Sequence, residues 1–136
     1  MGGRGASSGK YKRKGAWHTY GDEYKTVYQY RNIKFVKPKE GSATAPMETK
    51  TQGRVYVTLG SNGKPKYISY YAGSGNRRKQ IDLSGPSHKV NDEILNPPHT
   101  HNGFVHSEFG THKPNKREQN MIDRVLRIWN NHNSKD

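Results

Sequence analysis

The sequence predicts an α+β domain in which a twisted antiparallel β-sheet packs one face on a C-terminal helix and leaves the opposite face open for substrate. Three observations lead to this fold class. Residues 54–59, 66–71 and 77–83 alternate between apolar and polar side chains, which is typical of half-buried antiparallel strands. Glycine-containing turns separate these three segments. Residues 115–129 then carry apolar side chains at helical spacing.

The N-terminal segment differs in composition from the rest of the chain. Residues 1–14 contain Arg4, Lys10, Lys12, Arg13 and Lys14, many glycines and serines, and no acidic residue. Such a composition is typical of a linker or a disordered arm. We therefore expect residues 1–23 to be a basic Gly/Ser-rich linker or arm and residues 24–136 to form a single domain. Its first strands are expected at 26–30 and 32–36, before a polar loop that runs to residue 50.

The register of the three alternating segments follows from their turns. Asn62-Gly63 is a strong signal for a two-residue type I′ hairpin, which sets Val57 opposite Ile68. A four-residue loop at Gly73–Asn76 then sets Ile81 opposite Ile68 as well. The same register places Lys79 opposite Tyr70, and Asp82 opposite Tyr67.

The two faces of this meander differ in kind. One face is apolar and needs a cover, because exposed apolar strands are unfavourable in water. It carries Val55, Val57, Leu59, Ile68, Tyr70, Ile81 and Leu83. The other face is polar and aromatic, and it carries Arg54, Tyr56, Thr58, Tyr67, Ser69, Tyr71, Arg78, Gln80 and Asp82.

The C-terminal helix supplies the cover. Asn115 is a suitable N-cap, and Glu118 three residues later completes a capping box just after Pro114. The apolar stripe of this helix belongs to the core, and it consists of Met121, Ile122, Val125, Leu126, Ile128 and Trp129.

The charge of the chain favours a polyanionic partner. Its 136 residues include 24 Lys and Arg against 11 Asp and Glu, a formal net charge of +13, so nucleic acid is the leading candidate. There is no cysteine, which excludes disulfides, a thiolate nucleophile and Cys-ligated zinc. No window approaches the ~18 apolar residues of a membrane span, and the N-terminus lacks the apolar stretch of a secretory signal.

Three of the seven histidines lie in the segment from Pro98 to His106. Asn102-Gly103 within it predicts another two-residue hairpin. That turn would set His101 opposite Phe104, Thr100 opposite Val105, and His99 opposite His106. Because alternate residues of a strand share a face, all three histidines would project on one side. His88 lies eleven residues before His99.

These residue types suit RNA cleavage by transesterification, in which the 2′-hydroxyl attacks the adjacent phosphate. The reaction needs a base, an acid and a cation, but neither a metal nor a thiol, and histidine serves both proton roles near neutral pH. No cofactor is expected. The candidate catalytic residues are His99, His101, His106, His88, Lys79 and Asp82. The candidate RNA-binding residues, which supply charge and stacking surfaces, are Arg54, Tyr56, Tyr67, Tyr71, Arg77 and Arg78.

Three strings carry a resemblance to a known group of proteins: residues 66–71 (KYISYY), 79–83 (KQIDL) and 98–101 (PHTH), followed by Gly103 and His106. They resemble C-terminal toxin domains of bacterial polymorphic toxins and related phage or mobile-element proteins. Those domains are similar to the barnase, EndoU, colicin and RelE superfamily of metal-independent RNases. The resemblance covers roughly residues 54–129. It points to His99, His101, His106, Lys79 and Asp82 as the site.

The resemblance also implies partners and a place of action. A toxin of this kind would be a secreted or delivered effector that cleaves RNA, for example tRNA, in the cytoplasm of a target cell. The basic arm would then be the remnant of a linker to a delivery polypeptide. A cognate immunity protein is expected, and its surface should be acidic, because charge complementarity speeds encounter with a protein of charge +13.

Two other functions fit the same residues. The first is a non-catalytic nucleic-acid-binding module that uses the tyrosine-rich face and the basic arm, and it leaves the histidines unexplained. The second is a metal-dependent nuclease in which His99, His101 and His106 are ligands, with Glu108 or Asp82 nearby. His99 and His106 would be an ordinary solvated cross-strand pair if neither chemistry operates.

Overall fold

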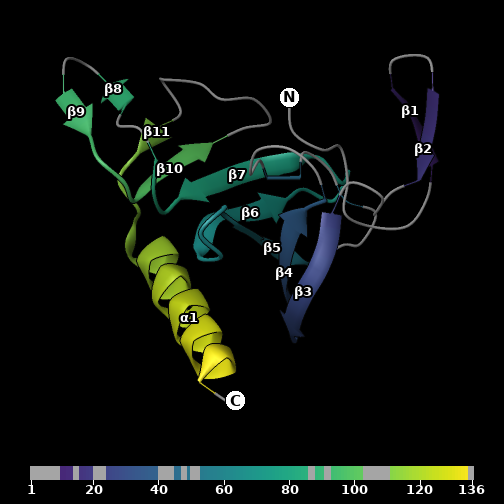
Figure 1. Cartoon of the computed structure of the whole chain (residues 1–136). Coiled ribbons are helices and arrows are strands. Elements are labelled where there is room, and N and C mark those ends of the chain that lie inside the picture. Colours follow the sequence, from purple (N-terminus) through teal and green to yellow (C-terminus); the bar gives the residue numbers. More distant parts are fainter. Residues whose placement is uncertain are drawn as a thin grey trace.

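The computed structural model describes residues 10–13, 16–19, 24–39, 45, 46, 49, 53–85, 88–90, 93–102 and 111–134. These residues form strands and one helix, drawn in Figure 1. The elements in chain order are β1 (Lys10–Arg13), β2 (Ala16–Thr19), β3 (Tyr24–Tyr30), β4 (Ile33–Pro38), β5 (Val55–Leu59), β6 (Pro65–Tyr71), β7 (Arg77–Asp82), β8 (His88–Val90), β9 (Glu93–Leu95), β10 (His99–Asn102), β11 (Thr111–His112) and α1 (Lys116–Asn133).

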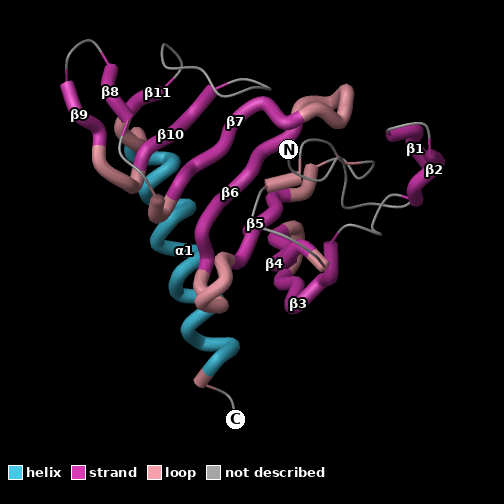
Figure 2. Tube along the Cα trace, turned by 45° about the horizontal axis from the view of Figure 1, so that its top comes forward, coloured by secondary structure: helices cyan, strands magenta, loops and turns pink. Residues whose placement is uncertain are grey.

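Seven strands form one sheet in the order β11-β10-β7-β6-β5-β4-β3. Helix α1 lies across one face of this sheet, behind β6, β7 and β10 in the view of Figure 2. All neighbours are antiparallel except β4 and β5, which run parallel and pair Ile33 with Val55. The predicted α+β class, with a mostly antiparallel sheet on a C-terminal helix, is therefore confirmed.

The register of the central meander is confirmed, although its turns are not of the predicted types. Val57 pairs with Ile68, and Ile68 pairs with Ile81. The amide of Gly63 donates to the carbonyl of Gly60, and the amide of Gly60 donates to the carbonyl of Lys64, so the first loop has three residues instead of two. The loop before β7 has the same pattern, between Ala72 and Asn76.

Each loop ends in a glycine with positive φ, +77° at Gly63 and +94° at Gly75. A three-residue loop shifts the pairing by one position relative to the predicted turns. A bulge in each hairpin, between Thr58 and Leu59 and between Tyr70 and Tyr71, shifts it back. The predicted pairs are therefore correct in the body of the sheet.

The core lies between the sheet and the helix, as predicted, but Leu126, which was expected to belong to it, is 37% exposed. The apolar face of the meander packs on Ile122, Val125, Ile128 and Trp129, and the stacked Phe35 and Trp129 rings are 4.9 Å apart. Burying each such side chain contributes about 1.5–3 kcal/mol. The capping box is also present. A capping side chain of this kind stabilises a helix by about 1 kcal/mol.

The second face of the sheet is buried where an open face was expected. Tyr56, Thr58, Ser69, Gln80 and Asp82 are all buried. Over β5 and β6 the cover includes the connection from β4 to β5, because its residues Ala45, Pro46 and Thr49 are buried as well. Thr49 Oγ1 lies 2.9 Å from the Tyr56 hydroxyl, and the Tyr71 hydroxyl donates to the Pro46 carbonyl. A parallel crossover has to pass over one face of the sheet, which explains this cover.

Two further pairs of strands lie outside the main sheet. β1 pairs with β2, within the segment predicted to be an arm, and β8 pairs with β9. Among the described residues, no helix combines the length and the apolar character that crossing a membrane requires.

Candidate functional site

The candidate site is built on β7 and β10, which are neighbours near one edge of the sheet. His99 pairs with Asp82, and His101 pairs with Gln80. Directly paired residues point to the same face, and so do alternate residues of one strand. All four side chains therefore project from the second face, on the side away from α1.

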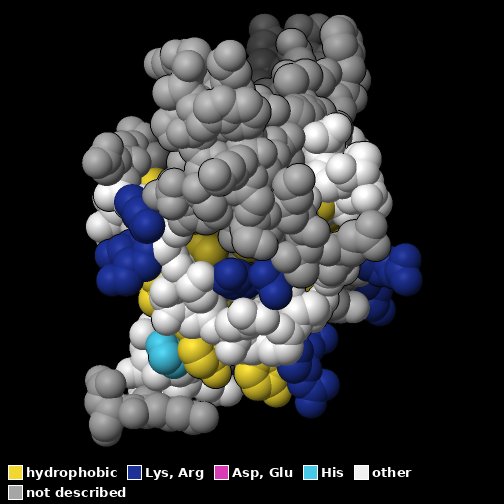
Figure 3. Space-filling model, turned by 90° about the vertical axis from the view of Figure 1, so that its right-hand side faces the viewer, with side chains coloured by type: hydrophobic (Ala, Val, Ile, Leu, Met, Phe, Trp, Pro, Cys, Tyr) yellow, Lys and Arg dark blue, Asp and Glu magenta, His cyan; other side chains and the backbone are white. Residues whose placement is uncertain are grey.

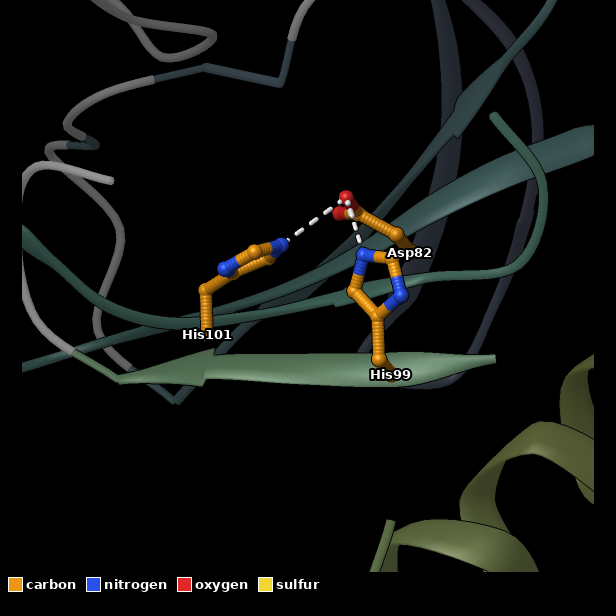
Figure 4. A group of neighbouring side chains, drawn as sticks. All are labelled: Asp82, His99 and His101. Carbon is orange, nitrogen blue, oxygen red and sulfur yellow. Dashed lines mark hydrogen bonds and ion pairs between the residues drawn. The ribbon is translucent and has the colours of Figure 1, made fainter. Parts of the chain in front are cut away.

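Two imidazoles converge on one carboxylate oxygen. His99 Nε2 and His101 Nε2 each lie 3.1 Å from Asp82 Oδ2, as Figure 4 shows. The two rings are nearly perpendicular, with centroids 4.7 Å apart. Two ring N–H groups can therefore donate to the same oxygen without the rings clashing.

A hydrogen-bond chain connects this carboxylate to a cation. The other oxygen of Asp82, Oδ1, accepts from Gln80 Nε2 at 2.7 Å. Gln80 Oε1 in turn accepts from Arg77 Nη1 at 2.8 Å. Arg77 is half-buried, and burial lowers its pKa from the ordinary arginine value while the charges of Tyr71 and Asp82 oppose that shift.

Burial and hydrogen bonding act in opposite directions on Asp82. Burial raises its pKa, but hydrogen bonds from His101 and Gln80 and the charges of both histidines outweigh that effect, so the pKa lies below the ordinary value. The carboxylate is therefore ionised at neutral pH. It can stabilise a protonated imidazole beside it.

His101 is held from both sides. Its Nδ1 lies 2.7 Å from the hydroxyl of Thr111 on β11, opposite the nitrogen that faces Asp82. The result is a line of carboxylate, imidazole and hydroxyl. Such a line can pass a proton from a hydroxyl to the imidazole while the carboxylate balances the new charge.

Both histidines are buried. His99 is 0% exposed and His101 is 3% exposed, so exposure does not distinguish the two rings.

Lys79, which the sequence grouped with these histidines, lies on the opposite face. It alternates with Gln80 on β7, and its Nζ lies 2.9 Å from Glu118 Oε2 on α1. The prediction that Lys79 lies beside the histidines is wrong, because side chains alternate along β7 and Lys79 points toward the helix. On the histidine side, Arg77 is a described cation that connects to Asp82 through Gln80.

The predicted hairpin at Asn102-Gly103 is also wrong. β10 pairs with β11, so Thr100 faces His112 and His101 faces Thr111. Phe104 and Val105, the partners that the hairpin predicted, lie outside the described residues. His106 lies outside them as well. His88 belongs to β8, but its side chain is not among those described.

The predicted RNA-binding tyrosines fall into two groups. Tyr56 is 0% exposed and Tyr71 packs edge-on against it at 5.4 Å, so the Tyr56 ring is not available to a base. Tyr67 is half-exposed and pairs with Asp82, which puts it beside the histidines. Arg54 lies 6.0 Å from the Tyr56 ring.

Arg78 is exposed at the bulge near the start of β7. Its guanidinium lies 5.7 Å from the centroid of the Tyr70 ring, on the helix side of the sheet.

Asp82, His99 and His101 also lie close enough together to be the ligands of a metal ion. One ligand atom from each of Asp82, His99 and His101 lies within 4.8 Å of the other two. Zinc binds such nitrogen and oxygen ligands at about 2.0–2.2 Å, and two histidines with one carboxylate also suit non-haem iron. A small movement of the side chains would bring the three atoms to these distances.

Sequence reasoning did not single out Gln80 or Thr111 as site residues. The strand alternation predicts the face of Gln80, which is the position between Lys79 and Ile81 that shares a face with Asp82. Thr111 carries no comparable signal, because it reaches His101 through the pairing of β10 with β11.

Comparisons of the chain with protein-family models, with curated proteins and with solved structures found no match.

Proposed function

We propose that this protein is an endoribonuclease that cleaves RNA by transesterification without a metal. The observation that carries the proposal is the convergence of His99 and His101 on Asp82, with Arg77 reaching the same carboxylate through Gln80. Proton carriers, a carboxylate and a cation are therefore together on one face. These are the groups that the reaction needs.

In the proposed reaction the 2′-hydroxyl oxygen attacks phosphorus and the bond to the 5′-oxygen breaks, leaving a 2′,3′-cyclic phosphate. His101 takes the proton of the 2′-hydroxyl, which would replace the Thr111 hydroxyl at Nδ1. Asp82 balances the imidazolium that forms, and His99 is a positioning residue. The group that returns a proton to the 5′-oxygen is proposed to be His106, which is a prediction from the sequence. Arg77 offsets the charge on the phosphorane.

The surface charge supports a nucleic-acid substrate. The described acidic side chains are Asp82, Glu118 and Asp123, and of these only Asp123 is exposed. Figure 3 shows one face of the molecule, on which Lys and Arg side chains are plentiful and no described acidic side chain is visible. A surface of this kind attracts phosphate backbones at long range.

The resemblance in the sequence supports a role as a toxin. We propose a delivered effector that acts on RNA, such as tRNA, in the target-cell cytoplasm, and that is neutralised by an acidic immunity protein. That partner would bind over the face that carries His99 and His101. Binding elsewhere, with substrate access left open, would contradict this mode of inhibition.

The test is incubation of the purified protein with total RNA and, separately, with plasmid DNA, in the presence of EDTA. The expected result is fragments from RNA alone, with cyclic phosphate ends, and their loss in His101→Gln. No cleavage under any condition, together with tight RNA binding, would instead favour a non-catalytic binding module.

A metal-dependent nuclease is the second candidate, because Asp82, His99 and His101 form a possible ligand set. It predicts the opposite response to metal. Cleavage would require zinc, manganese or iron, would stop in EDTA, and would return when the metal is restored. Cleavage that persists in EDTA would exclude this mechanism.

A further inference from the structure

A cationic groove lies between the β3–β4 turn and the C-terminal half of α1. It has a volume of about 530 Å³, and its lining includes Tyr28, Tyr30, Arg31, Arg124, Arg127 and His132. Three arginines therefore meet in one hollow, and none of the described residues that line it is acidic. Within the described part of the chain, no carboxylate forms an ion pair with any of the three.

The side chains that form one wall of this groove pack against the hydrophobic core. Tyr28 stacks on His132 at 3.9 Å, and His132 lies 5.5 Å from Trp129. Trp129 in turn packs on Phe35 in the centre of the core. The groove therefore does not need to be assembled by a ligand, which lowers the entropic cost of binding.

The position of Arg31 is set by the backbone. It occupies the two-residue turn between β3 and β4 with φ of +55°, the one non-glycine residue with positive φ among those described. Its guanidinium lies 5.6 Å from the centroid of the Tyr30 ring, and Tyr30 is 39% exposed. Charge and an aromatic surface therefore lie side by side.

We propose that this groove is a second RNA-binding site that holds the phosphodiester backbone of the substrate away from the site of cleavage. Guanidinium groups are suited to phosphate oxygens, and an exposed tyrosine beside them can stack an unpaired base. The inference rests on the proposed function for the identity of the ligand. A hollow shape with an aromatic wall favours a nucleic-acid strand over a flat lipid surface.

The location of the groove sets the size of the substrate. In the sheet β3 lies five strands away from β10, and at about 4.8 Å per strand this separation is about 24 Å. The groove is also on the helix side of the sheet, whereas the histidines project from the opposite face. No dinucleotide can reach both sites. The preferred substrate is therefore a long or folded RNA.

The test compares two double variants with equal loss of charge. Arg31→Gln with Arg127→Gln alters the groove, whereas Lys116→Gln with Arg117→Gln alters two exposed cations at the other end of α1. Binding is measured to a 2′-O-methyl RNA oligonucleotide, which resists transesterification, at several salt concentrations. Because this RNA is not cleaved, the result is independent of the proposed catalysis.

We expect the groove variant to lose about 10-fold or more in affinity at low salt. Its plot of log affinity against log salt should be shallower by about 0.7 for each lost phosphate contact, while the control should change by less than about 2-fold. In cleavage assays, activity on long RNA should fall and activity on a dinucleotide should not. Equal losses in the two variants, or loss of binding to phosphatidylserine vesicles in place of RNA, would overturn the proposal.

Discussion

Two buried carboxylates lie at the same edge of the sheet, one on each face, and they differ in what they hold. Glu118 accepts from the Lys79 ammonium, the Thr100 hydroxyl and the Asn115 backbone amide, and the His112 ring lies farther off at 3.4 Å, so its contacts join the start of α1 to β7, β10 and β11. Asp82 is held by a glutamine and two imidazoles, and imidazole is the side chain that most often transfers protons in catalysis. The partners, rather than the burial, separate a structural carboxylate from one suited to chemistry.

The largest difference should be seen in activity. His101→Gln removes the proposed proton carrier beside Asp82, and RNA cleavage should fall on the order of 10³-fold. His112→Gln changes a histidine on the Glu118 side, 3.4 Å from that carboxylate, and should leave cleavage nearly unchanged. Initial rates on a labelled RNA measure both. Equal losses in the two variants would remove the distinction between the faces.

For the stability of the fold, we expect Glu118 to matter more than the histidine side of the sheet. Glu118→Ala leaves Lys79, which is 17% exposed, without its partner and removes half of the capping box. The free energy of unfolding should fall by about 3 kcal/mol, as found when one member of a buried ion pair is removed. Asp123→Ala, on the exposed side of the same helix, is the control and should change it by less than about 0.5 kcal/mol. Urea unfolding followed by tryptophan fluorescence provides the measurement.

A smaller change tests one contact of the Glu118 cluster. Thr100→Val keeps the shape of the side chain but removes the hydroxyl that donates to Glu118 at 3.1 Å. The expected loss is about 1 to 2 kcal/mol, because the hydrogen bond has a charged acceptor and is fully buried. Cleavage by the folded variant should be unaffected. A stability equal to that of the unaltered chain would show that Lys79 and Asn115 alone satisfy Glu118.

The smallest effect should appear only in acid. For Glu118, burial raises the pKa, but the Asn115 amide, Lys79 and Thr100 lower it further, so the folded pKa lies below that of the unfolded chain. The resulting stability is present above the unfolded glutamate pKa of about 4.3 and is lost as the pH falls through the folded value. Unfolding free energies of the protein and of Glu118→Gln between pH 6 and 2 should show a shallower decline in the variant. Parallel declines would contradict the assignment.

Much of the fold follows from local patterns in the sequence. The alternation in β5, β6 and β7 and the stripe of α1 predict which side chains meet in the core, and Asn115 with Glu118 predicts where the helix begins. The turn types were wrong, because the first loop is one residue longer than predicted and the second one residue shorter, but the register survived because a bulge in each hairpin compensates. Core burial specifies register more strongly than turn chemistry does.

The site was less predictable because it depends on contacts between distant segments. The pairing of β10 with β11 brings His101 to Thr111 across the connection of residues 103–110, whereas Asn102-Gly103 at the start of that connection favoured a tight hairpin with other partners. The parallel pair of β4 and β5 has no local signal either. The error at Lys79 is of another kind, because the predicted register already placed it opposite Tyr70, on the helix side.

The alternation of β7 has a consequence for folding fidelity. Gln80 and Asp82 serve the histidines, while Lys79 and Ile81 serve the helix and the core. A slip of one residue would exchange the two sets, since side chains alternate with a period of two. It would place a lysine among the imidazoles and a carboxylate in the hydrophobic core. A misregistered chain would thus lose its core packing and its histidine cluster together, so a chain that folds with the correct core also has these side chains correctly assembled.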